Sequence, residues 1–230
     1  MATVDRYLVE RPRDVESVPD QIKTAFEGIL DICQRHSISR VTLVVPKKGG
    51  WENTLVGEAL GARVAKALLK GEAVPLIKGG PAMTLESPQT FRNSVSPGLI
   101  VGAHISEADM AKIDDCWDAA AILYMPWTEA EGRAWQATWK PETIGPSTWT
   151  EPTSALSAPV KEALEKLTRN INLGSGLGHP SDKTLAVKTI GRLRAEGHAL
   201  DPAEIKRWAL RHAWSSHAAS DLEAIVKKAR

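Results

Sequence analysis

The sequence contains little cysteine, which excludes two classes of small protein. Its two cysteines, Cys33 and Cys116, are too few for a disulfide framework and lack the paired spacing of a zinc site. Both lie in apolar-rich segments, so we expect buried thiols in a reducing compartment. The acidic run from Asp114 to Asp118 is more typical of a solvated helix end than of a metal site. The sequence therefore predicts neither a metal nor a cofactor.

Long apolar runs are also missing. No stretch approaches the roughly 18 uninterrupted apolar residues of a membrane-spanning helix. The first residues, "MATVDRYLVERPRD", carry charges where a secretory signal has an apolar run. No internal repeat is present. These absences predict a cytoplasmic protein without membrane contact.

Net charge is small but unevenly distributed. The chain carries a formal charge of +1, yet residues 1–143 hold 16 Lys and Arg against 19 Asp and Glu. Residues 144–230 hold 13 against 9, together with four of the six histidines. A mildly basic second part favours contact with an anion there.

Apolar segments rich in β-branched residues alternate with amphipathic helical patterns in the first part of the chain. The predicted strands are 40–45, 73–77, 82–86, 98–103 and 119–125, the second and third forming a possible hairpin. Predicted helices cover 20–36, 52–69 and 107–115, and another follows a capping box at Thr128 and Glu131. Such alternation requires crossover connections. We expect a Rossmann-like, three-layer α/β domain with a mostly parallel sheet over residues 1–143.

The remaining residues indicate a linker followed by helices. Residues 144–158 are rich in Pro, Ser and Thr without periodicity, as expected of a linker. Residues 159–230 predict a small all-α helical bundle. Its start signals are Ser157, Ser181, Asp201 with Pro202, and Ser215.

The stretch "LGSGLGHPSDKTLAV" (173–187) contains glycines close to a Lys-Thr pair. A P-loop needs glycine immediately before that pair, but Asp182 stands there, and the preceding segment is helical instead of a strand. A dinucleotide fingerprint fails on its glycine spacing as well. We interpret the stretch as a glycine-rich joint before a helix capped by Ser181, with close approach to a ligand or partner backbone left open.

A better phosphate candidate follows the strand 40–45. Lys47, Lys48, Gly49 and Gly50 lie between this strand and the next helix. Ligands in open α/β sheets bind beyond the carboxyl ends of the strands, where these residues are expected. They form a candidate anion or phosphate site, although Lys-Lys-Gly-Gly is also an ordinary solvated turn.

His104 follows the strand 98–103 and is the candidate catalytic residue. Its reference pKa near neutrality suits general acid–base work, and Glu107 and Asp109 are nearby carboxylates. The alternative is structural: Ser106 and Asp109 are explained by helix capping, and His104 by a hydrogen bond to a backbone carbonyl.

Cations concentrate on two predicted helices of the bundle. This candidate surface for nucleic acid or a partner protein comprises Lys183, Lys188, Arg192, Arg194, Lys206, Arg207 and Arg211. Exposed cations on a helical trio are compatible with phosphate contact. Solvated helix faces carry similar charges, and Glu196, Asp201 and Glu204 interrupt the patch.

Tryptophan is overrepresented: eight of the twelve aromatic residues are Trp, and five lie within residues 117–149. Indoles at helical spacing, as at Trp135 and Trp139, usually pack a helix on a sheet, whereas exposed ones stack on ligands or form protein interfaces. No nucleophile is recognisable. Our leading hypothesis is a non-catalytic binding or adaptor protein whose bundle contacts a protein partner, a larger assembly, DNA or RNA. The alternative is an enzyme acting on a nucleotide or phosphorylated small molecule at the carboxyl edge of the sheet.

Overall fold

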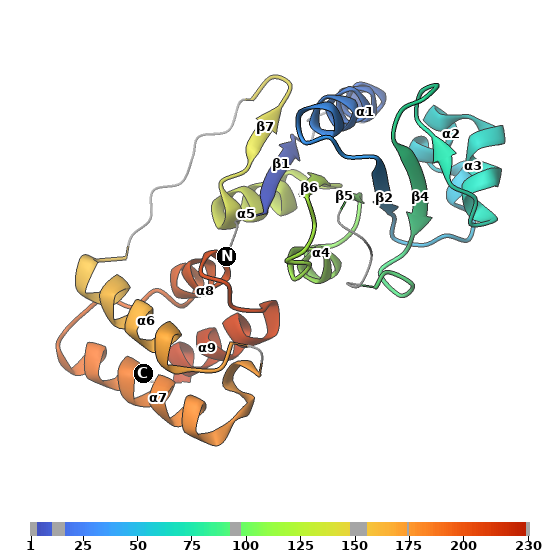
Figure 1. Cartoon of the computed structure of the whole chain (residues 1–230). Coiled ribbons are helices and arrows are strands. Elements are labelled where there is room, and N and C mark those ends of the chain that lie inside the picture. Colours follow the sequence, from blue (N-terminus) through green and yellow to red (C-terminus); the bar gives the residue numbers. More distant parts are fainter. Residues whose placement is uncertain (1–3, 11–16, 93–97, 148–155, 174, 229–230) are drawn as a thin grey trace. The chain divides into compact units, whose positions relative to one another are not determined.

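Seven strands in the described part of the chain form one sheet (Figure 1). The computed structural model describes residues 4–10, 17–92, 98–147, 156–173 and 175–228. The strands follow the order β3-β4-β2-β5-β6-β1-β7, and all neighbours are parallel except β3, which pairs antiparallel with β4. Their bounds are β1 (Asp5–Val9), β2 (Arg40–Val44), β3 (Val74–Pro75), β4 (Ala82–Glu86), β5 (Leu99–Ala103), β6 (Ala121–Met125) and β7 (Glu142–Ile144). The predicted mixed α/β architecture with a mostly parallel sheet is confirmed.

Helices cover both faces of this sheet. On one face, α1 (Val18–Arg35), α2 (Leu55–Leu60) and α3 (Ala62–Leu69) share a buried apolar core with alternate strand residues such as Leu43 and Leu123. On the other face, α4 (Glu107–Asp114) and α5 (Glu129–Trp139) pack over the strand residues that alternate with these, such as Tyr124. There the ring of Tyr124 meets that of Trp135 edge-on, with centroids 5.5 Å apart. Burial on both faces explains the continuous apolar strands.

Two strands were not predicted. β1 lies between β6 and β7, although its sequence begins with the charged pair Asp5-Arg6. β7 has three residues and ends at Ile144, inside the segment predicted as a linker. Residues 148–155 of that segment lie outside the described residues, and the other predicted domain boundaries stay predictions.

The predicted helix 52–69 is interrupted. A 3₁₀ turn, η2 (Trp51–Asn53), precedes α2, and α2 ends before Gly61, whose φ of 82° is left-handed. Gly61 adopts this conformation without a side-chain clash, so α3 starts in a new direction. Apolar periodicity continues across the break, which is why the sequence pattern predicted one helix.

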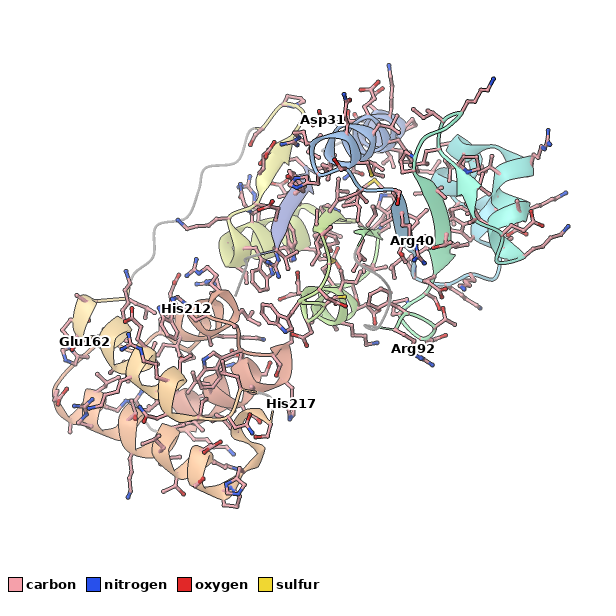
Figure 2. All side chains as sticks on the ribbon, viewed as in Figure 1. Asp31, Arg40, Arg92, Glu162, His212 and His217 are labelled. Carbon is pink, nitrogen blue, oxygen red and sulfur yellow. The ribbon has the colours of Figure 1, made fainter. Side chains whose placement is uncertain are left out.

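The second compact unit contains the remaining described helices. These are α6 (Ala158–Asn170), the 3₁₀ turn η3 (Gly176–Gly178), α7 (Pro180–Ala195), α8 (Pro202–Arg211) and α9 (Ser216–Lys228). They enclose a separate apolar core that includes Trp208 and Trp214, and the Trp214 indole N–H donates to Thr168 Oγ1 at 2.9 Å. The imidazole of His212, labelled in Figure 2, stacks on Trp208 with centroids 3.8 Å apart.

Side-chain capping was predicted correctly at four helix starts and not at two others. Ser157 precedes α6 as predicted, but its side chain forms no capping hydrogen bond. The side chains of Ser106, Thr128, Asp201 and Ser215 accept backbone N–H groups as expected. The helix α7 instead begins at Pro180 with His179 as its N-cap, because proline is pre-set for the first helical position. Ser181 Oγ therefore lies inside the helix, 2.8 Å from His179 Nδ1.

The glycine-rich joint is a packed turn. A Cβ added at Gly176 would lie 2.6 Å from Ala218 Cβ, and Leu177 is buried. Gly174 lies outside the described residues. Glycine is required at residue 176 because of close helix packing and a φ of 57°.

A buried ion pair links β1 to α4. Arg6 Nε lies 3.4 Å from Asp114 Oδ1, and both side chains are almost fully buried. Asp114 Oδ2 also accepts the Trp135 indole N–H at 2.9 Å, so one carboxylate connects β1, α4 and α5. The prediction of a solvated acidic helix end is wrong at Asp114. This pairing also explains how arginine occupies an interior strand.

Asp114→Ala leaves the buried Arg6 guanidinium without its carboxylate. We expect the free energy of unfolding to fall by about 3–5 kcal/mol, the usual cost of breaking a buried pair from one side. Urea denaturation followed by circular dichroism measures it. Asp31→Ala is the matched control, because Asp31 is exposed on α1 (Figure 2) and its ion-pair partner among the described residues is Arg35 on the same helix. The cost of this substitution should stay below about 1 kcal/mol. Equal losses in both variants would contradict the assignment.

Both cysteine thiols are poor nucleophiles in the folded protein. Burial raises the pKa of Cys33 to about 11, and burial together with the Asp118 carboxylate raises the pKa of Cys116 to about 12. At pH 8 no more than about one thiol in a thousand is therefore a thiolate, the reactive form. We expect a disulfide reagent such as Ellman's to label the protein only after unfolding in guanidinium. Rapid stoichiometric labelling of the native protein would show that this description is wrong.

Candidate functional site

The neighbouring strands β2 and β5 form a topological switch point. Val41 to Val44 pair in parallel with Leu99 to Gly102. After β2 the chain passes through η2, α2 and α3 toward β4, on one side of β2. After β5 it passes through α4 to β6, on the other side. Chains that separate in this way leave a crevice at the carboxyl edge, the usual ligand position in open α/β sheets.

A cavity of about 540 Å³ lies at this position, within the size range of small-molecule sites. It is lined by the segments that follow β2, β5 and β6. The lining residues are Val45, Pro46, Lys47, Gly49, Gly50, Trp51, Asn53, Thr54, Leu55, Val56, Ala103, His104 and Trp127. Residues predicted separately as an anion site and as a catalytic residue therefore share one cavity.

Lys47 and the two glycines form the wall contributed by the β2 loop. The Lys47 side chain is exposed and forms no ion pair with any described residue. Gly50 has a φ of 76°, and a Cβ placed there would meet nothing within 4 Å. The loop thus presents a lysine cation beside open backbone, an arrangement suited to an anion.

Lys48 does not line the cavity. Its Nζ lies 2.9 Å from Glu86 Oε2, at the end of the neighbouring strand β4. Burial would raise the pKa of Glu86, but hydrogen bonds from Thr90 and Lys48 outweigh burial and lower it. This ion pair ties the β2 loop to β4. Anion binding by Lys48 stays a prediction.

His104 contributes the wall beyond β5 in an uncommon backbone conformation. Its φ is 55°, a left-handed value that costs energy for a side chain larger than glycine. The backbone N–H donates to Met125 O at 2.8 Å, joining this residue to the end of β6. Such local strain is found preferentially at functional sites, which fits the position of His104 at the cavity.

Gln21 of α1 orients the His104 ring. The Gln21 amide nitrogen donates to Glu10 O and Pro126 O at 3.2 and 3.3 Å, so its Oε1 is the acceptor. His104 Nε2, 3.4 Å from Oε1, therefore carries the proton. This contact orients the imidazole at the cavity wall.

Gln21 was missed by sequence reasoning, which weighed Glu107 and Asp109 as carboxylate partners of His104 against helix capping by Ser106 and Asp109. At the start of α4, the Asp109 carboxylate accepts a hydrogen bond from the Ser106 hydroxyl, and the Asp109 backbone N–H donates to Ser106 Oγ. The Asp109 carboxylate also pairs with Lys112. Gln21 is 83 residues from His104 in sequence. The available signal was a polar side chain on the apolar face of α1, next to Ile22.

Two tryptophans flank the cavity in different environments. Trp51 is 2% exposed, and its indole N–H has no hydrogen-bond partner among the described residues. Trp127 is 46% exposed, and its ring meets that of His104 edge-on with centroids 4.9 Å apart. Trp135 packs in the core as predicted, whereas Trp149 lies outside the described residues.

The cations of the bundle are largely engaged within it. Arg207 lies 2.6 Å from Glu204, Lys206 lies 3.4 Å from Glu223, and Arg194 donates to Val226 O. Arg192 lies 4.0 Å from Glu196, and burial lowers the pKa of Arg211. Engaged cations have less to offer a phosphate backbone, since each contact requires breaking an existing one.

Lys183 and Lys188 of α7 are exposed and form no ion pair with any described residue. Lys183 lies beside a shallow cavity of about 310 Å³ between α7 and α9, together with the exposed Val187. Binding of a protein partner, DNA or RNA by the bundle stays a prediction.

Within the described ranges, no group of three or more His, Cys, Asp or Glu side chains is placed to hold a metal ion. The same residues include no helix that is long and apolar enough to cross a membrane. The predicted cytoplasmic location stays a prediction.

Comparison with known proteins concerns the bundle alone. Residues 157–230 match a family model described as a domain of unknown function (DUF1889). No curated protein and no solved structure matches the chain. The cavity lies outside the matched residues, so its interpretation depends on its own geometry.

Replacing Gln21 tests the hydrogen bonds that it forms beside the cavity. Gln21→Leu removes the donor of two buried carbonyl groups, so we expect the free energy of unfolding to fall by about 1–3 kcal/mol. Urea denaturation measures the change. The control, Gln89→Leu, alters an exposed glutamine and should change stability by no more than about 0.5 kcal/mol. A Gln21→Leu protein as stable as the control would show that these hydrogen bonds do not form.

Proposed function

We propose that the chain binds a nucleotide or another phosphorylated small molecule in the cavity at the carboxyl edge of its sheet. The observation that carries this proposal is that Lys47, Gly49, Gly50 and His104 line one cavity at the switch point between β2 and β5. The enzyme hypothesis named Lys47, Lys48 and His104 at this edge, and two of these three residues, Lys47 and His104, line the cavity. It favours a small-molecule site over an adaptor role for the first unit.

The chemistry of the walls supports a phosphorylated ligand. Lys47 supplies a positive charge that no described carboxylate neutralises, and a phosphate is a strong acceptor for an ammonium group. Gly50 leaves backbone open where a side chain would fill space. His104 stands on the opposite wall with its tautomer set by Gln21, so a role in proton transfer remains part of the enzyme hypothesis.

The fold suits this function as a Rossmann-like domain in the broad sense. A Rossmann-like domain has parallel strands with helices on both faces of the sheet, and it binds its ligand at the switch point. The observed order of the parallel strands, β4-β2-β5-β6-β1-β7, differs from the 3-2-1-4-5-6 order of dinucleotide-binding domains. We therefore base the ligand class on the cavity and not on the strand order.

Lys47→Ala tests the site directly. Isothermal titration with ribose 5-phosphate, glycerol 3-phosphate and adenosine monophosphate should show binding by the wild-type chain and about tenfold weaker binding by the variant, because an ion-assisted hydrogen bond to phosphate is lost. Lys70→Ala is the control, since Lys70 is exposed at the end of α3, outside the cavity lining. The proposal fails if no phosphorylated compound binds, or if both variants bind as the wild type does.

A further inference from the structure

Trp127 is a large apolar side chain that remains 46% exposed at a cavity wall. The other exposed large apolar side chains of the described chain, Ile77, Trp117 and Val187, do not line this cavity. Exposed apolar surface at a concave site marks a place where a ligand is covered. An indole offers a broad flat face, which suits another flat ring.

The orientation of the Trp127 indole is set by the protein. Its ring contacts the His104 ring at 4.9 Å and an interplanar angle of 68°. His104 is anchored through its backbone to Met125 and through Nε2 to Gln21, which also holds the carbonyl of Pro126, the residue before Trp127. A ring fixed before binding loses little conformational freedom when it stacks on a ligand.

The positions of Trp127 and Lys47 define the length of the ligand. Lys47 follows β2 and Trp127 follows β6, and β5 lies between these two strands. Two strand spacings correspond to about 10 Å at the edge of the sheet. A ribose joins a flat base to a phosphate over a comparable reach, so one nucleotide can contact both walls.

We propose that the ligand of this cavity is a nucleoside monophosphate, with its base packed against the indole of Trp127 and its phosphate bound by Lys47. This inference rests on the proposed function and narrows it, because it requires a flat ring in addition to the phosphate. One lysine at the lining matches one phosphate group. Asn53 lies in the same lining as a polar contact for the sugar.

Three probes separate the two parts of the ligand: adenosine monophosphate, ribose 5-phosphate and adenosine. By isothermal titration of the full chain, we expect the monophosphate to bind at least about tenfold more tightly than ribose 5-phosphate, as base–aromatic stacking allows. Trp127→Ala should remove this advantage and leave ribose 5-phosphate binding unchanged within about twofold. Trp127→Phe should retain most of it. Trp117→Ala, which alters an exposed indole outside the lining, should bind like the wild type.

The outcomes distinguish failure of this inference from failure of the proposed function, the binding of a phosphorylated small molecule. Equal affinity for the monophosphate and ribose 5-phosphate overturns the inference and leaves the phosphorylated ligand standing. If Trp127→Ala weakens the binding of adenosine monophosphate and of ribose 5-phosphate equally, the inference is also overturned and the phosphorylated ligand stands. A native circular dichroism spectrum of Trp127→Phe, together with its binding, separates this outcome from misfolding. Adenosine binding as tightly as the monophosphate, or no binding by any probe, overturns both.

Discussion

The structure of the first unit depends on one constraint: right-handed crossovers place a helix according to the direction in which the chain moves along the sheet. From β1 to β2 and on to β4 the chain moves one way, so α1, α2 and α3 cover one face. From β5 onward it moves the other way, and α4 and α5 cover the opposite face. The two directions separate between β2 and β5, and the cavity lies at the carboxyl ends of these strands. The cavity follows from this topology and not from a special loop.

Loops that line such a crevice are held in place partly by neighbouring residues that do not line it. The chain separates these tasks between neighbours. Lys48 holds the β2 loop to Glu86, while Lys47 lines the cavity. Gln21 holds two carbonyl groups and the His104 ring, while His104 forms the wall. Lys48 and Gln21 thus hold the segments that carry Lys47 and His104, which gives the site a fixed shape before any ligand binds.

Sequence reasoning predicted what depends on local pattern. The covered strands β2, β5 and β6 read as continuous apolar runs, and their loops gave Lys47 and His104 as candidate residues. It missed what depends on long-range pairing. β1 contains Arg6, tolerated because Asp114, 108 residues away, neutralises it, and Gln21 reaches His104 across 83 residues. Lys48 was indistinguishable from Lys47 in sequence, since the difference between them lies in Glu86 on another strand.

The two units also differ in how they use their cations, and this difference separates a binding site from a structural surface. In the bundle, Lys206 and Arg207 face Glu223 and Glu204, so their charge stabilises α8 and its contact with α9. A partner would have to displace those carboxylates and replace their contacts, which lowers the net gain from each new ion pair. Lys47 has no such internal competitor among the described residues. An anion at the cavity therefore gains the attraction of Lys47 without breaking an existing pair. Lys183 and Lys188 of α7 are likewise without an ion pair among the described residues, but Lys47 shares one cavity lining with Gly49, Gly50 and His104. This combination is our reason for placing the phosphate at the cavity.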